Sequence, residues 1–388
     1  MVTTTPPWSP VGWESDKGSP QRCDVAIVGG GLAGLTTALD LAQAGVDVVV
    51  FEAREDLGQG AVGRGNGLVQ LGLCEHPIQL VGAIGHDDAA ELLAYSQQSI
   101  EMIDSEDVWF SQGGLWCASM DREDEGIARS TQWLQQVGLD CSGLEGRALH
   151  QRLGQSGFAT GRFHAEEGSV DPRCLLEGIA QRSRTAGAKI FLGHAVRSVD
   201  ETPDGLCVSG ADWTCHADMV VYSAGWRSVD VDGWYADKLF PVRAQHLWES
   251  TSSGMEMSGR TQHGYTAWGP TLEGRVVSGC RWGSPHMEVG ESTDRLNDRI
   301  SAHLARFVGR FGEQVDVARR EWTSIMTFTC DALPILGPFP GQPRKISCLG
   351  FNGQDLAFAM AAARSVATGI LEGTGHAIPT RLQSHRFL

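Results

Sequence analysis

The sequence predicts an α/β protein in which a domain built on a parallel sheet is discontinuous and an antiparallel sheet is inserted into it. Three observations support this prediction. A strand, a glycine-rich turn, an apolar helix and a second strand follow one another between residues 24 and 52. Apolar strand and helix patterns of the same kind return at 165–225 and 346–372. Between them, residues 241–330 alternate in places between polar and apolar, which is typical of antiparallel strands.

The first segment has the pattern of a dinucleotide-binding, Rossmann-like unit. Residues 25–28 form an apolar strand, and Gly29, Gly31 and Gly34 follow it. We expect Gly29 to allow a tight turn, Gly31 to let backbone N–H groups approach a pyrophosphate, and Gly34 to let the helix pack closely on the strand. The positive end of that helix then faces the phosphates. Glu52 ends the second strand, where its carboxylate can bind a ribose diol.

Composition narrows the class of protein. The 388 residues carry a formal net charge of -16, which disfavours nucleic acid and anionic membrane surfaces as partners. No apolar run approaches the ~20 residues that a membrane helix needs, and residues 1–10 lack the pattern of a signal peptide. The ten cysteines are scattered, with no Cys-x-x-Cys pair. We therefore expect a reduced, cytoplasmic protein without a membrane span.

The order of the segments predicts two domains. A nucleotide domain comprises residues 1–75, 165–240 and 331–388, and a substrate domain comprises 76–164 and 241–330. A simple NAD dehydrogenase usually keeps its nucleotide domain in fewer pieces, so the split favours FAD. Locally, we expect Trp8 and Trp13 to pack the N-terminal arm on the body. We also expect a hairpin around Gly113 and Gly114, and a strand over residues 263–268.

Seven motifs in order resemble those of the D-amino-acid oxidase and glycine oxidase superfamily of flavoproteins. The likeness is greatest to its amine-oxidising branch, which includes γ-glutamylputrescine oxidase-like and sarcosine oxidase-like members. It covers most of residues 22–372. The motifs are residues 28–35, 63–67, 168–172, 217–225, 241–245, 330–337 and 350–353.

The resemblance implies an FAD site. Residues 63–67 should run along the flavin ring and its phosphates, since glycines remove side-chain bulk where backbone touches a flat ring. Residues 350–353 should open a helix whose positive end points at the flavin pyrimidine edge and stabilises reduced flavin; the alanines of that helix also suit plain packing. The residues predicted to bind the cofactor are Gly29, Gly31, Leu32, Ala33, Gly34, Glu52, Ala53, Gly63, Arg64, Asn66, Gly67, Val196, Ala224, Gly225, Gly350, Asn352, Gly353 and Gln354.

Two departures from the resemblance bear on function. Amino-acid-oxidising relatives carry an arginine that clamps the substrate carboxylate five residues before the aspartate matching Asp331. Met326 occupies that position here. Sarcosine-oxidase-like relatives carry a flavin-linking cysteine one residue earlier, and here that residue is Ile325. We therefore expect noncovalent FAD, and either a substrate without an α-carboxylate or another carboxylate-binding residue. Cys330 is expected to be a small buried residue.

Arg281, Tyr265 and His263 are the candidates for the substrate site. Arg281 lies where sarcosine oxidase-like members place a lysine over the flavin; the alternative is a surface arginine at a strand end. On a strand, His263 and Tyr265 would share one face and could line the cavity. Cross-strand packing explains Tyr265 equally and His263 better. His246 and Trp248 are weaker candidates of the same kind. The acidic cluster of Asp121, Glu123, Asp124 and Glu125 is expected to be a solvated loop or helix start, and we expect no metal site.

The predicted reaction is oxidation of a C–N bond. The flavin N5 would accept a hydride from the carbon next to a neutral amine, and water would hydrolyse the resulting imine. Reduced flavin would be reoxidised by oxygen or by another acceptor. An alternative is an N-methyl or D-amino acid whose carboxylate Arg281 holds. A further alternative is a flavin-bound interaction module without catalysis.

Overall fold

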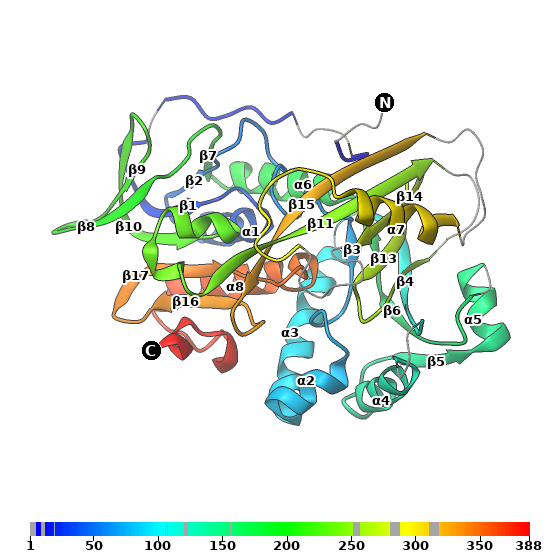
Figure 1. Ribbon diagram of the computed structural model, residues 1–388. Coiled ribbons are helices and arrows are strands. Elements are labelled where there is room, and N and C mark those ends of the chain that lie inside the picture. Colours follow the sequence, from blue (N-terminus) through cyan, green and yellow to red (C-terminus); the bar gives the residue numbers. More distant parts are fainter. Residues whose placement is uncertain are drawn as a thin grey trace. The chain divides into compact units, whose positions relative to one another are not determined.

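The computed structural model describes residues 5–8, 12–18, 20–104, 106, 108–119, 123–154, 157–250, 257–279, 288–309 and 318–388. The chain divides into two compact units. One unit comprises residues 10–63, 173–241 and 326–388, and the other comprises 1–9, 64–172 and 242–325. Each unit is therefore assembled from three separate segments of the chain (Figure 1).

The first unit is built on a largely parallel sheet. Its strands are β1 (Arg22–Val28), β2 (Val48–Phe51), β7 (Lys189–Phe191), β8 (Ser198–Thr202), β9 (Gly205–Ser209), β10 (Thr214–Tyr222), β16 (Ile335–Phe339) and β17 (Gln342–Leu349). Its helices are α1 (Leu32–Gln43), α6 (Pro172–Thr185) and α8 (Asp355–Glu372), with 3₁₀ turns at Gly225–Asp230, Gly233–Tyr235, Thr380–Leu382 and Ser384–Phe387. The strand order is β16-β17-β10-β1-β2-β7, with β9 and β8 continuing from β10.

Strand β1 lies inside this sheet, which suits its run of buried apolar side chains from Val25 to Val28. It pairs in parallel with β2 on one side and with β10 on the other, so that Val28 lies level with Phe51 and Tyr222. Helices α1 and α8 pack against one another (Figure 1). Strand order reverses at β1, and the carboxyl ends of strands at such a point are where open α/β sheets bind ligands.

The second unit is built on a larger, mostly antiparallel sheet. Its strands are β3 (Leu68–Val69), β4 (Trp109–Cys117), β5 (Cys141–Glu145), β6 (Thr160–Val170), β11 (Leu239–Ser250), β12 (Ser258–Thr261), β13 (Thr266–Thr271), β14 (Gly274–Gly279) and β15 (Arg319–Thr329). Its helices are α2 (Pro77–Ile84), α3 (His86–Asp104), α4 (Glu123–Gln136), α5 (Gly146–Leu153) and α7 (Asp298–Gly309). The strand order is β15-β11-β14-β13-β12-β4-β6-β3, with β5 on β6.

One face of this sheet carries a continuous apolar core. Leu115, Trp268 and Val277 from the strands pack with Ile300 and Leu304 of α7 and with α5. Figure 1 shows α7 beside β14, which it contacts. The β12–β4 pair is parallel, unlike the neighbouring pairs. The predicted fold class, an α/β protein with a discontinuous parallel-sheet domain and an inserted antiparallel sheet, is confirmed.

Two local features differ from the sequence-based expectations. Residues 64–75 and 165–172 group with the second unit because β3 pairs with β6. The predicted hairpin at residues 108–120 is wrong. Residues Trp109–Cys117 form the single strand β4, and Gly113 uses its φ of 92° for a bulge instead of a reversal. The Gly-Gly pair has the composition of a turn, but only one of its glycines adopts a left-handed conformation.

The N-terminal arm packs on the body, as predicted. Trp8 is 6% exposed and stacks on Phe110, and the Arg184 guanidinium lies 4.2 Å from the centroid of the Trp13 ring. None of the helices in the described parts of the chain combines the length and apolarity that a membrane span needs. All of the described cysteines are free thiols.

Candidate functional site

The turn after β1 shows three different environments for its three motif glycines. Gly29 has a φ of 109°, and a Cβ on it would lie 2.8 Å from the carbonyl oxygen of Ser223. A Cβ on Gly34 would overlap the carbonyl oxygen of Gly29. At Gly31, no described atom lies within 4 Å of the position that a Cβ would take. Gly29 and Gly34 are thus required by backbone geometry and packing, whereas Gly31 borders open space at the start of α1.

Glu52 follows β2 and holds this turn in place. Its Oε2 accepts a hydrogen bond from the backbone N–H of Gly30 at 2.7 Å, and its Oε1 accepts one from Arg54 at 2.9 Å. Burial raises the pKa of the Glu52 carboxyl, and these two backbone donors oppose the rise. A carboxylate has about four lone-pair sites, so the group can accept these bonds and still accept ribose hydroxyls. Ala53 comes next in the chain.

The loop before α8 is held by the side chain of Asn352. This residue is 3% exposed and has a φ of 54°. Its Oδ1 accepts from the backbone N–H of Thr329 at 2.9 Å, and its Nδ2 donates to the carbonyl of Gly350 at 2.8 Å. Gly350 and Gly353 both have a φ of 82°. Asn352 therefore fixes the loop, which ends at Gln354, the N-cap of α8.

The other predicted cofactor residues of the first unit lie on several different segments. Leu32 and Ala33 form the buried first turn of α1. Ala224 and Gly225 follow β10, and a Cβ on Gly225 would lie 2.7 Å from Thr327 Oγ1. Val196 packs on the edge of the parallel-sheet core. At Gly63, a Cβ would overlap the backbone of Gly58.

Three predicted cofactor residues belong to the second unit. Arg64 Nε donates to the carbonyl of Thr323 at 3.0 Å. Asn66 Oδ1 accepts from the backbone N–H of Leu68 at 3.0 Å. Gly67 has a φ of 71°, and its carbonyl accepts from the N–H of Val170. This loop is therefore held by contacts to β15, to the first residue of β3 and to the end of β6.

The predicted strand over residues 263–268 is wrong at its start. His263 and Tyr265 lie in the turn between β12 and β13, and β13 begins only at Thr266. Gln262 and His263 have φ values of 56° and 55°, which are left-handed and uncommon for residues other than glycine. The alternation argument that placed both side chains on one face therefore does not apply. Both residues remain half-buried.

The remaining residues singled out in the sequence differ in their burial. His246 is a core residue that bonds Ser278 Oγ and Ser324 Oγ at 2.8 Å each, and burial lowers its pKa to about 3. Trp248 also lies in the core. Cys330 is exposed, so the expectation of a small buried residue is wrong; it follows the end of β15 instead of lying within the strand. Arg281 lies outside the described residues.

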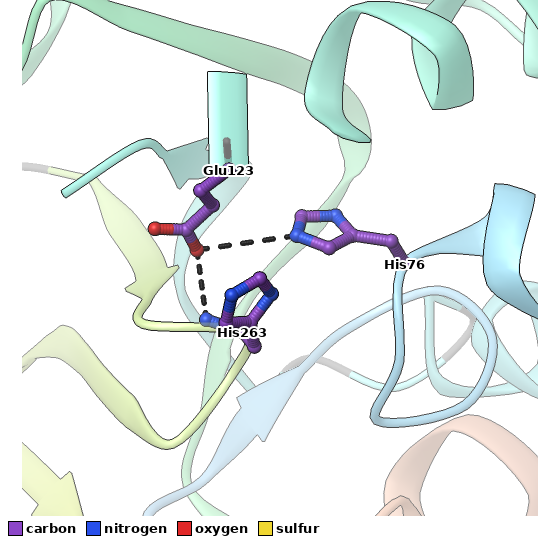
Figure 2. Close-up of side chains that lie close together, drawn as sticks. All are labelled: His76, Glu123 and His263. Atoms are coloured by element: carbon purple, nitrogen blue, oxygen red, sulfur yellow. Dashed lines mark hydrogen bonds and ion pairs between the residues drawn. The ribbon is translucent and has the colours of Figure 1, made fainter. Parts of the chain in front are cut away.

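The structure brings together three side chains that the sequence did not connect. His76 precedes α2, Glu123 begins α4, and His263 lies in the β12–β13 turn (Figure 2). Each offers one metal-ligand atom, and these atoms lie within 4.8 Å of one another. Glu123 is fully buried, so the expectation of a solvated helix start is wrong for this residue, although Asp124 and Glu125 are exposed. Burial lowers the pKa of His76 to about 3, with smaller contributions from nearby cationic groups.

The parallel-sheet unit fits an adenine dinucleotide. Strand, glycine turn, helix and acid stand in the expected order, and α1 has no acidic residue in its first turn to compete with a phosphate. Open space beside Gly31 leaves room for a ligand at the helix end. These observations define an α/β protein with a dinucleotide-binding unit.

Comparisons with known proteins identify the family. The family model described as "FAD dependent oxidoreductase" (DAO) matches residues 24–368. Glycine oxidase of Bacillus licheniformis is 23% identical over 90% of this chain and 94% of its own length. Gamma-glutamylputrescine oxidoreductase of Escherichia coli K12 is 28% identical over 46% of this chain and 44% of its own length. The structure of L-proline dehydrogenase from P. horikoshii superposes with a TM-score of 0.79 at 16% identity, covering 95% of this chain and 98% of the other.

The chain belongs to the DAO family of FAD-dependent oxidoreductases. The predicted cofactor, FAD, and the predicted enzyme class are confirmed by this membership. The resemblance deduced from the seven motifs is confirmed as well.

Proposed function

We propose that this flavoenzyme oxidises a C–N bond of a small amine. Bound FAD would supply the chemistry by accepting a hydride at N5 from the carbon next to the amine nitrogen. The resulting imine is then hydrolysed by water to a carbonyl compound and an amine. The relatives support oxidation of a C–N bond, since they include a glycine oxidase and a gamma-glutamylputrescine oxidoreductase, and the name of the second points to an amine.

Met326 is the observation that favours an amine without an α-carboxylate. It lies on β15, half-buried, beside Thr327. The carbonyl of Thr327 accepts a hydrogen bond from the backbone N–H of Asn352, in the loop that opens α8. The position that carries a clamping arginine in amino-acid-oxidising relatives is thus next to the predicted flavin loop, and here it bears a thioether. A thioether is only a weak acceptor and cannot pair with a carboxylate.

We assign no catalytic base to this chain. An amine that binds in its neutral form already has the lone pair needed to expel a hydride. The protein's tasks are then to bind FAD, to orient the substrate and to exclude water. Noncovalent attachment of FAD is part of the proposal, because the position of the flavin-linking cysteine in relatives is Ile325 here. We also infer a reducing, cytoplasmic location from the free thiols.

The competing substrate class is an N-methyl or D-amino acid whose carboxylate Arg281 holds. The variant Arg281→Lys distinguishes the two. If Arg281 pairs with a carboxylate, a point ammonium cannot reproduce its planar fork, and losing such a pair typically costs ~2–5 kcal/mol. Stopped-flow measurement of anaerobic flavin reduction should then show substrate binding weakened by at least about tenfold.

The amine proposal predicts a different result for the same position. Arg281→Lys should leave the flavin-reduction step nearly unchanged. If the arginine instead supplies positive charge near reduced flavin, Arg281→Met should slow reoxidation by oxygen while leaving anaerobic reduction intact. A sharp loss of amine binding in Arg281→Lys would contradict the proposal and favour the amino-acid alternative.

A further inference from the structure

We propose that His76, Glu123 and His263 form a binding site for a divalent transition-metal ion of the zinc type. Two imidazoles and one carboxylate are a ligand set that zinc accepts, with a water in the fourth position. The three ligand atoms lie within 4.8 Å of one another, and His76 Nε2 is 4.0 Å from Glu123 Oε1. Small side-chain rotations would bring them to the ~2.0–2.2 Å bond lengths that zinc requires.

His76 carries the strongest indication of a ligand. Its side chain is 1% exposed, and neither ring nitrogen has a hydrogen-bond partner among the described residues. The ring is fixed by stacking on Trp116, with centroids 3.9 Å apart. Figure 2 shows that it points toward Glu123 and the turn that carries His263. Buried polar groups without partners cost free energy and are rare in native proteins, and a metal ion would satisfy this imidazole.

Glu123 is held by donors that leave its carboxylate facing the two histidines. Its Oε1 accepts from the backbone N–H of His263 at 2.7 Å and from Trp116 Nε1 at 3.3 Å, and its Oε2 accepts from the N–H of Ser119 at 2.9 Å. Such outer contacts orient metal ligands in known sites. The bond to His263 also holds that residue in its left-handed conformation, close to the other ligands. His263 is half-buried, which gives an ion a route to the site.

The ligand atoms, and not the surrounding charge, determine which metal ion the site favours. Arg162 and Arg260 lie near the Trp116 ring, and both pair with Glu167, at 3.7 Å and 3.2 Å. Together with Glu123, these groups sum to about zero charge, so general electrostatic attraction for a cation is weak. Calcium and magnesium prefer several oxygen ligands, whereas imidazole nitrogens favour zinc, cobalt, nickel and copper. We therefore expect transition metals to bind and magnesium and calcium not to compete.

The test uses the FAD-loaded protein, stripped with a chelator and dialysed against Zn²⁺. Wild type should retain one equivalent of zinc per chain after gel filtration, and excess Mg²⁺ should not displace it. His76→Phe keeps a flat ring for stacking on Trp116 but removes both nitrogens. His263→Asn keeps a residue type that tolerates a positive φ. Because loss of outer partners alone typically lowers metal affinity about 10–100-fold, each variant should weaken zinc binding at least about 100-fold.

His216→Asn is the matched control, since His216 is exposed on β10, outside the cluster. It should bind zinc like wild type. Circular dichroism and FAD content show whether each variant is folded. A folded His76→Phe/His263→Asn double variant that binds zinc as tightly as wild type would place the metal elsewhere and overturn the proposal. Wild type that retains no zinc above the double-variant background would overturn it as well.

Discussion

Two glycines of the same turn allow folding and cofactor binding to be separated. At Gly34, an added methyl group would overlap the carbonyl oxygen of Gly29 and lie 2.6 Å from Ser223 Oγ. The carbonyl belongs to the backbone and cannot rotate away, so α1 must move off β1. Overpacking of this kind costs ~1–3 kcal/mol, partly offset by the ~1 kcal/mol by which alanine favours a helix over glycine. Because the overlapped atom is backbone, the upper end of that cost applies, and Gly34→Ala should lower stability by about 2 kcal/mol.

Gly31 should behave in the opposite way. Its φ of −83° suits any residue, and no described atom lies within 4 Å of a Cβ there. Gly31→Leu should therefore change the stability of the apoprotein by no more than about 0.5 kcal/mol. Its side chain would instead occupy the approach to the helix end, where a pyrophosphate binds. We expect FAD affinity to fall at least about 100-fold, which is about 2.7 kcal/mol.

The assay measures the midpoint of thermal unfolding for both apoproteins, with and without added FAD, and FAD affinity by flavin fluorescence. FAD should stabilise wild type by mass action but should not stabilise Gly31→Leu at the same concentration. Gly34→Ala should unfold at a lower temperature even as apoprotein. If Gly31→Leu binds FAD like wild type, the turn after β1 is not the phosphate site. If Gly34→Ala is as stable as wild type, the packing argument fails.

Three further predictions follow from single residues. Acid precipitation should release FAD into the supernatant, because Ile325 replaces the flavin-linking cysteine; yellow colour in the pellet would contradict this. Burial raises the pKa of Asp355 to about 6, above its unfolded value of about 3.9. Ionisation therefore opposes folding, so the contribution of Asp355 to stability should be greatest below about pH 4, fall between about pH 4 and 6, and stay constant above that range. Asp355→Asn should remove that decline, up to about 3 kcal/mol, and an unchanged pH profile of unfolding would refute the assignment. Cys330 is exposed, so Cys330→Ser should remove one fast-reacting thiol from a titration of the native protein with a thiol reagent; an unchanged number of fast thiols would show that Cys330 is shielded.

The sequence was most informative where one local pattern determines the structure. The strand, turn and helix from β1 to α1 could be predicted from the sequence. Gly29 and Gly34 are required there by close contacts with residues a few positions away or at the end of the adjacent strand. The N-terminal arm could also be predicted, since two tryptophans are costly to expose. In each case the relevant contacts follow from residue type alone.

Side-chain positions that depend on contacts between distant segments could not be predicted from the sequence. His263 and Tyr265 alternate as in a strand, yet a left-handed turn held by Glu123 displaces them from β13. Glu123 stands in an acidic run, and nothing local distinguishes it from its exposed neighbours. Its burial depends on Trp116 and on His76, which no spacing rule connects to it. The metal-type cluster could therefore be found only after folding had brought three distant segments together.

The central claim is that FAD in this protein is reduced by an amine without an α-carboxylate. The most direct measurement is the anaerobic absorbance spectrum of the purified flavoprotein during titration with matched pairs of compounds, each pair an amine and the same amine bearing an α-carboxylate. We predict that the flavin bands bleach with the uncarboxylated member and bleach at least about tenfold more slowly with its partner. Bleaching confined to the carboxylated members, or no bleaching by any amine, would contradict the proposed function.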